Sequence, residues 1–234
     1  MKKTLIITGG SKGIGRATIN SFLKQGYRCI NISRSSIAEP GVLQINADLS
    51  QLSWLQACAQ KLKDAIADAD QICLIHNAGM MNKDDIQNCE PVDLATVLQV
   101  NVIASQQLNQ LILPYMHEGS SILYVGSTLS EKAVANSCSY VVSKHAVAGL
   151  MRATCQDLAG AGIHTACICP GFTDTEMLRT HLGDDPSIID SIAKLNAYER
   201  LVKPGEIVSV LQFCANNPVI NGTLIHANLG QLEI

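Results

Sequence analysis

Three side chains that could exchange a proton with a substrate stand close together in the sequence: Ser127, Tyr140 and Lys144. Tyr140 and Lys144 are four residues apart. That is about one helical turn, so the phenol and the ammonium share a face of a helix. A positive charge beside a phenol favours its ionised form, which makes the tyrosine a proton donor or acceptor near neutral pH. The spacing alone is a weak signal, because chance produces it in many proteins.

A glycine-rich turn near the start of the chain gives a second signal: it reads Thr8-Gly9-Gly10-Ser11-Lys12-Gly13-Ile14-Gly15. An apolar run precedes it and a helical apolar period follows it, so the glycines join a strand to a helix. Gly9 allows the tight turn, Gly13 lets the backbone approach a pyrophosphate, and Gly15 lets helix and strand pack closely. The helix N-terminus then offers N–H groups to phosphates. The alternative is a glycine-rich turn that binds nothing.

The elements that must position these residues alternate between strands and helices. Strands are predicted over 3–8, 27–33, 42–46, 71–76, 121–127, 163–169 and 223–228, and helices over 13–25, 51–67, 91–117, 138–160 and 204–215. Right-handed β-α-β crossovers give an α/β fold: a Rossmann-type doubly wound parallel sheet of about seven strands with helices on both faces. We expect one domain over residues 1–234, since no linker or repeat interrupts it.

Residues 171–203 interrupt this alternation with a long connection that holds two weakly helical pieces. Connections of this length in compact domains are usually functional. The segment follows a strand at the edge of the sheet where ligands bind, so we expect it to be a substrate lid. The alternative is a surface insertion that only packs.

Composition limits the classes of function. The chain has 234 residues, 47% of them hydrophobic and only 4% aromatic, with a net charge of −3. These values suit a parallel sheet and give no basic surface for nucleic acid.

No apolar run reaches the roughly 18 residues of a membrane span, and the first strand leaves no room for a signal peptide, so we expect a cytoplasmic protein. The nine cysteines show no metal-ligand spacing, and His76 is expected to pack or hydrogen-bond rather than bind a metal.

The motifs together resemble the short-chain dehydrogenase/reductase family, in its short single-domain branch. They occur in the order of the family: Thr8-Gly9 with Gly13 and Gly15, Asp48, Asn77-Ala78-Gly79, Asn101, Ser127, Tyr140 with Lys144, and Pro170-Gly171. The resemblance covers nearly the whole chain, and this joint order is far more specific than any one motif.

The resemblance implies a catalytic role for four residues. Tyr140 would donate a proton to the carbonyl oxygen, Lys144 would favour the phenolate and hold the nicotinamide ribose, and Ser127 would hydrogen-bond the substrate oxygen. Asn101 would hold a water that links the lysine to solvent. In isolation, Ser127 could simply cap the loop after its strand, and Asn101 could be a helix-surface amide.

The resemblance also implies the cofactor contacts. They are Gly9, Ser11, Lys12, Gly13, Ile14, Gly15, Arg34, Asp48, Leu49, Asn77, Ala78, Gly79, Tyr140, Lys144, Pro170, Gly171, Thr173 and Thr175. Asp48 would meet the adenine amine, although it could instead be an N-cap near Ser50. Thr173 would meet the carboxamide through its backbone, and Thr175 the pyrophosphate through its hydroxyl.

The choice between the two nicotinamide cofactors rests on charge. Relatives that prefer NAD usually carry an acid at the end of the second strand, whereas this strand ends Ser33-Arg34. Arg34 and Lys12 could flank a 2′-phosphate, which favours NADPH over NAD, unless both are solvated surface charges. NADPH in turn favours carbonyl reduction as the direction of the reaction.

The substrate and the assembly stay open. A small-molecule carbonyl reductase, similar to benzil and sepiapterin reductases, is preferred over a 3-oxoacyl-[acyl-carrier-protein] reductase, since Asp184 and Asp185 add negative charge near the lid. A dinucleotide-binding sensor without catalysis is the alternative from another class. The tail Ile225-His226-Ala227-Asn228-Leu229-Gly230 departs from the family's pattern, so a homodimer and a homotetramer are both expected possibilities. Helices around 101–117 and 138–160 are the predicted dimer contact.

Overall fold

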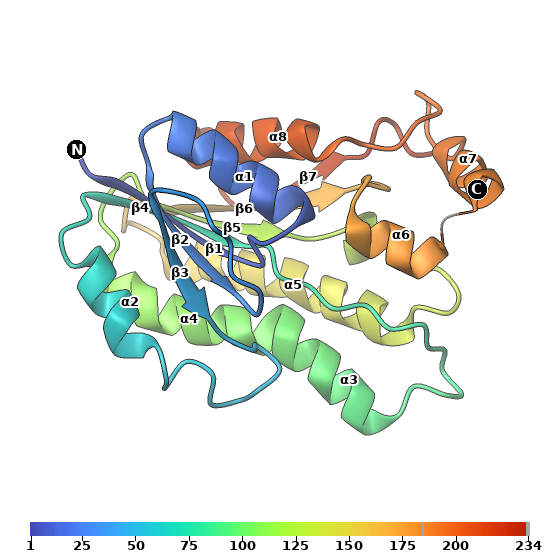
Figure 1. Cartoon of the computed structure of the whole chain (residues 1–234), viewed down its shortest axis with the longest axis horizontal. Coiled ribbons are helices and arrows are strands. Elements are labelled where there is room, and N and C mark those ends of the chain that lie inside the picture. The colour runs from blue at the N-terminus through green and yellow to red at the C-terminus, as the bar shows by residue number, and fades with distance from the viewer. Residues whose placement is uncertain (184, 233–234) are drawn as a thin grey trace.

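The computed structural model, which describes residues 1–183 and 185–232, has helices on both sides of one parallel sheet (Figure 1). Its strands are β1 (Lys3–Thr8), β2 (Arg28–Ser33), β3 (Val42–Asn46), β4 (Gln71–His76), β5 (Ser121–Val125), β6 (His164–Pro170) and β7 (Thr223–Ala227). They pair in the order β3-β2-β1-β4-β5-β6-β7, with every pair parallel. The predicted doubly wound α/β fold is confirmed.

Two helical layers cover the sheet (Figure 1). Helices α1 (Gly13–Lys24) and α8 (Pro204–Asn216) pack on one face, and α2 (Ala59–Ile66), α4 (Ala104–Ile112) and α5 (Cys138–Asp157) pack on the other. Helix α3 (Pro91–Leu98) leads into α4, while α6 (Glu176–Leu182) and α7 (Pro186–Ala193) lie in the connection after β6. Strands such as β1 and β4 bury every residue after their first, as a sheet covered on both faces requires.

The direction of winding reverses at β1. β2 and β3 extend the sheet from one side of β1, and β4 to β7 extend it from the other. In such sheets a crevice forms where the order reverses, outside the carboxyl ends of the strands, and ligands bind there. The ends of β1 and β4 therefore mark the place where a site is expected.

The predicted helix over 51–67 is wrong in its first half, because only Ala59–Ile66 is helical. Residues 51–58 form successive turns, in which Trp54 N–H donates to the Gln51 carbonyl rather than four residues back. Contacts from α4 hold these turns: the Trp54 indole N–H donates to Gln107 Oε1 at 2.8 Å, and Gln107 Nε2 donates to the Leu52 carbonyl at 2.8 Å. Tertiary hydrogen bonds thus override the helical apolar spacing.

A buried polar network crosses the layer between the sheet and its helices. The Tyr124 hydroxyl on β5 lies 2.7 Å from Asn109 Nδ2 on α4 and 2.9 Å from Thr154 Oγ1 on α5. Asn109 Oδ1 lies 2.7 Å from His76 Nε2 on β4. Because that amide oxygen accepts, Nε2 carries the hydrogen, and the buried Nδ1 is left without a partner among the described residues. His76 is therefore the packing and hydrogen-bonding residue that the sequence predicts.

This network predicts a pH-dependent stability. Burial lowers the pKa of His76 to about 4, and the bond to Asn109 opposes the shift only in part. An unfolded histidine has a pKa of about 6.5, so the unfolded chain binds the proton more readily. The contribution to stability is then fully present above about pH 6.5 and is lost as the pH falls towards 4. Between pH 7 and pH 5 we expect a loss of roughly 2 kcal/mol in the free energy of unfolding.

Denaturant unfolding at the two pH values measures this loss. In His76→Gln the difference between pH 7 and pH 5 should shrink, whereas His117→Gln, at an exposed position, should keep it. An equal pH difference in wild type and His76→Gln would show that another group is responsible.

Candidate functional site

The loops after β1 and β4 are bound together in the crevice where the sheet reverses. Asn77 Nδ2 donates to the carbonyls of Thr8 and Gly9, at 3.0 Å each. In return, Thr8 Oγ1 accepts from the backbone N–H groups of Asn77 and Ala78, at 3.1 and 3.0 Å. Asn77 and Ala78 thus brace the glycine turn.

The glycine turn leaves room for a ligand that approaches its backbone. Gly9 and Gly13 have φ angles of +69° and +51°, which disfavour residues with a Cβ. A Cβ at Gly15 would lie 2.3 Å from the Gly9 carbonyl oxygen, so Gly15 lets α1 begin against the turn. No side chain within the described residues caps the N-terminus of α1, and its first turn holds no acid. Free N–H groups and a cradle without side chains fit a pyrophosphate.

Tyr140 and Lys144 both project from the first turns of α5, on the same side. The Lys144 ammonium lies 5.4 Å from the centre of the Tyr140 ring and donates to the Val125 carbonyl at 2.9 Å. Lys144 is only 4% exposed, whereas Tyr140 is half-buried. The carbonyl at the end of β5 therefore fixes the ammonium beside a phenol that a substrate can reach.

Ser127 follows β5 and does cap the next turn. Its Oγ accepts from Leu129 N–H at 3.1 Å, while Ser130 Oγ accepts from Ser127 N–H at 3.2 Å. Capping uses a lone pair of the Ser127 hydroxyl and leaves its hydrogen available to donate. The capping alternative is thus correct and compatible with a second bond to a substrate oxygen.

Asn101 lies in a π-helical segment, Gln99–Ile103, that joins α3 to α4. Its Nδ2 donates to the Met80 carbonyl at 3.0 Å and to Ser143 Oγ at 2.8 Å, and its Oδ1 accepts from Met80 N–H at 2.7 Å. At 3% exposure it is not a surface amide. The amide positions the loop after β4 against α5, so the predicted water relay would have to use other atoms of Asn101 and stays a prediction.

The connection after β6 begins beside the glycine turn. Thr173 is buried and donates to the Gly171 carbonyl at 2.9 Å, just after Pro170 ends β6. Thr175 caps α6, and its Cγ2 would lie 3.1 Å from a Cβ at Gly13. Thr175, which the resemblance predicts to contact the pyrophosphate, therefore lies next to Gly13 of the turn predicted to receive it. Whether 171–203 closes as a lid stays a prediction, and Asp184 lies outside the described residues.

The two basic residues predicted to flank a 2′-phosphate lie against different elements. Lys12 forms an ion pair with Glu176 at the start of α6. Ser11 and Ile14, the other predicted cofactor contacts near it, belong to the same glycine turn as Lys12. Arg34 is exposed at the end of β2 and joins no ion pair within the described residues. Arg34 is therefore the more available of the two.

Asp48 and Leu49 lie just beyond β3. Asp48 is exposed and accepts from Ser50 N–H at 3.1 Å and from Ser50 Oγ at 2.9 Å, which lowers the pKa of its carboxyl. The predicted alternative of a turn-capping role near Ser50 is what these bonds describe. Leu49 is buried, and its carbonyl accepts from Gln99 Nε2 at 3.2 Å.

Two contacts around the site have no signal in the sequence. Asp84 accepts from the Ser139 N–H at 3.0 Å and from the Ser139 hydroxyl, which ties the loop after β4 to the residue before Tyr140. Arg16 and Glu39 form an ion pair at 2.5 Å that holds the loop after β2 to α1. Neither pair has a local motif, because each partner lies on a distant segment.

Comparison with known proteins agrees with this geometry. The family model for short chain dehydrogenases matches residues 3–185, and the chain belongs to that family of oxidoreductases. It is 26% identical to carbonyl reductase family member 4 of Xenopus tropicalis, over 100% of both chains. It is 25% identical to an acetoacetyl-CoA reductase of Synechocystis sp., over 97% of this chain and 95% of the relative.

Solved structures show the same fold. A short chain dehydrogenase family protein from Francisella tularensis superposes with a TM-score of 0.89 at 26% identity, over 98% of each chain. Within the described part of the chain, none of the helices combines the length and apolar character needed to cross a bilayer.

Proposed function

We propose that the protein reduces a carbonyl to an alcohol with NADPH as the hydride donor, as a small-molecule carbonyl reductase. The observation that carries this proposal is the Lys144 ammonium held beside the Tyr140 ring and bonded to the Val125 carbonyl, two residues before Ser127. The loop after β4 connects this pair to the glycine turn that fits a pyrophosphate, since Gly79 lies next to Lys144 and Asn77 bonds to Gly9. The similarity to carbonyl reductase family member 4 supports the same class of reaction. A screen of NADPH oxidation against diketones, acetoacetyl thioesters, quinones and keto-sugars tests it.

Tyr140 and Ser127 would act on the substrate oxygen, and Lys144 would act on Tyr140. Tyr140 donates its hydroxyl proton to that oxygen, and Ser127 donates its free hydroxyl hydrogen to the same atom, which stabilises the charge that develops there. The phenolate left on Tyr140 is stabilised by the Lys144 ammonium, which the Val125 carbonyl fixes at 2.9 Å. The bound dinucleotide supplies the hydride, and in the reverse direction Tyr140 accepts the proton.

The cofactor would be held by the residues at the reversal of the sheet. The turn over Gly9–Gly15 and Thr175 would receive the pyrophosphate. Asn77, Ala78 and Gly79 would lie along the adenosine ribose, and Lys144 would reach the nicotinamide ribose. A Cβ at Gly79 would lie 3.7 Å from Lys144 Nζ, so a glycine there leaves open the approach to the ammonium.

A 3-oxoacyl thioester reductase is the second candidate function. The similarity to the acetoacetyl-CoA reductase supports it, since the same three side chains would reduce a thioester-linked ketone. Turnover of acetoacetyl thioesters well above that of diketones in the screen would favour this candidate. Binding of NADPH without turnover of any carbonyl would favour the non-catalytic sensor.

Arg34 gives a testable basis for the preference for NADPH over NADH. In Arg34→Gln, we expect the ratio of kcat/KM for NADPH to that for NADH to fall by about tenfold or more, since hydrogen bonds to charged groups contribute about 1.5–3 kcal/mol. Arg28→Gln is the matched control, because Arg28 begins the same strand and pairs with Asp68. A wild-type enzyme that prefers NADH tenfold would overturn the assignment.

A further inference from the structure

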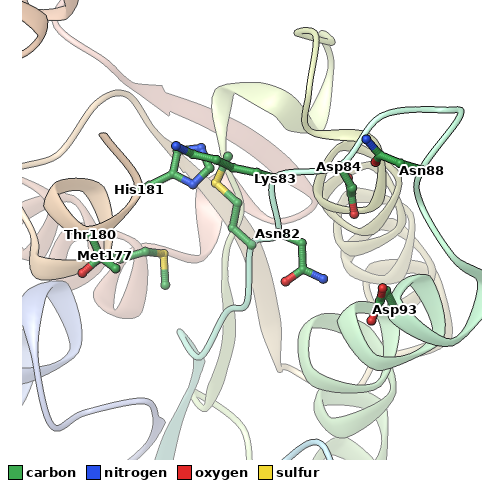
Figure 2. A pocket seen from close by; sticks show the side chains of 9 residues that line it. Asn82, Lys83, Asp84, Asn88, Asp93, Met177, Thr180 and His181 are labelled. Carbon is green, nitrogen blue, oxygen red and sulfur yellow. The ribbon is translucent and has the colours of Figure 1, made fainter. Parts of the chain in front are cut away.

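A cavity of about 790 Å³ lies between the loop after β4 and α6. Figure 2 shows Lys83 from the loop and His181 from the helix on one side of it, with Asp84 and Asp93 towards the other. Met177 and Thr180 of α6 complete the side that carries the two basic groups (Figure 2). The cavity is therefore polarised, with positive charge beside α6.

The two basic side chains approach each other. In Figure 2 the Lys83 side chain extends across to the His181 ring. Partial burial and the positive charge of Lys83 together lower the pKa of His181. Neither residue joins an ion pair among residues 1–183 and 185–232. At neutral pH the Lys83 ammonium therefore carries the positive charge, and the neutral His181 imidazole beside it offers an N–H donor. An ammonium without an acidic partner in the described residues, next to such a donor, forms a place where an anion is stabilised.

The acids of the same cavity have other roles. Asp84 accepts two hydrogen bonds from Ser139 at the start of α5. Asp93 lies in the first turn of α3, where the helix dipole favours a carboxylate. Two acids at or just before the start of α6 also have partners: Glu176 pairs with Lys12, and Asp174 pairs with Arg179. None of these contacts involves Lys83 or His181.

The cavity adjoins the proposed reaction site through three connections. Its loop begins just after Met80, whose backbone Asn101 binds. The same loop reaches Ser139, the residue before Tyr140, through Asp84. On the other side, Thr175, the N-cap of α6, lies beside Gly13. A substrate whose carbonyl lies at Tyr140 could therefore extend a second group into this cavity.

We propose that this cavity binds an anionic group of the substrate, a carboxylate or a phosphate, between Lys83 and His181. The inference rests on the proposed function and narrows its substrate to ketones or aldehydes that carry such a group. The reaction itself is unchanged, since the anion would be bound both before and during reduction. A contact of that kind acts on KM more than on kcat.

Two matched pairs of substrates test the inference. 4-Oxopentanoate is compared with its methyl ester, and dihydroxyacetone phosphate with dihydroxyacetone, each with NADPH. For wild type we expect kcat/KM to favour the anion by about tenfold or more in at least one pair, mainly through KM. The pair with the larger preference identifies carboxylate or phosphate as the group bound.

Variants separate this site from general charge effects. Lys83→Met and the double variant Lys83→Met/His181→Gln should bring the ratio of anion to neutral substrate close to one. Lys24→Met is the matched control, because Lys24 is exposed in the last turn of α1, and it should leave the ratio unchanged.

Two results overturn the inference while reduction of neutral diketones still stands. They are an equal kcat/KM for both members of each pair in wild type, or an unchanged ratio of anionic to neutral substrate in the double variant. Loss of turnover with every carbonyl, diketones included, defeats the proposed function and this inference with it.

Discussion

Tyr140→Phe is expected to slow the reduction of a reactive diketone by about 10²–10⁴-fold, the usual contribution of a positioned general acid. The substitution keeps the ring beside the Lys144 ammonium, 5.4 Å from its centre, and removes only the hydroxyl. Lys144 keeps its bond to the Val125 carbonyl, so NADPH should still bind. The rate is measured from NADPH oxidation at saturating cofactor, and binding from the change in NADPH fluorescence.

Tyr115→Phe is the matched control. Tyr115 lies in the short 3₁₀ turn after α4, away from the site, and its loss of a hydroxyl should leave the rate near that of wild type. If Tyr140→Phe turns over the diketone at the wild-type rate, Tyr140 is not the proton donor.

Gly15→Ala is expected to weaken NADPH binding by more than about a hundredfold, because the clash is with backbone. The new Cβ would lie 2.3 Å from the Gly9 carbonyl oxygen and 2.9 Å from Gly10 Cα. Neither atom can move away as a side chain would, so the turn and the start of α1 must separate. The cradle for the pyrophosphate is then lost together with the packing of helix on strand. The dissociation constant is measured by fluorescence titration, and the melting temperature is measured in parallel.

Gly205→Ala distinguishes this local effect from a general cost of adding a methyl group. Gly205 lies in the first turn of α8, where a Cβ would meet no atom of the described residues within 4 Å. Its replacement should leave NADPH binding unchanged and stability equal or slightly higher. Normal NADPH affinity in Gly15→Ala would mean that the dinucleotide does not use this turn.

Local sequence patterns predict the sheet well. The apolar runs over 3–8 and 71–76 coincide with β1 and β4, because a strand buried on both faces leaves a nearly continuous apolar run. The prediction over 42–46 also coincides with β3, although that edge strand buries only one of its five residues. The π-helical segment Gln99–Ile103 within the predicted helix 91–117 has no such signature. It depends on contacts of Asn101 with Met80 and Ser143, which no local spacing reveals.

In the candidate site, too, the residues with a sequence motif could be predicted and the contacts between distant segments could not. Family motifs predict which residues gather at the reversal of the sheet, and the structure brings the glycine turn, Asn77, Tyr140 and Lys144 to that edge. The partners of charged residues could not be predicted. Lys12 pairs with Glu176, which is 164 positions away, and Lys83 approaches His181 only because α6 folds back over the loop after β4.

The most direct test of the central claim is the stoichiometry of a reaction with wild-type protein, NADPH and a diketone. The account predicts that one molecule of hydroxyketone forms for each NADPH consumed, with the alcohol identified by mass spectrometry. Protein that binds NADPH but yields no alcohol from any carbonyl, or that consumes NADPH without forming one, would contradict it.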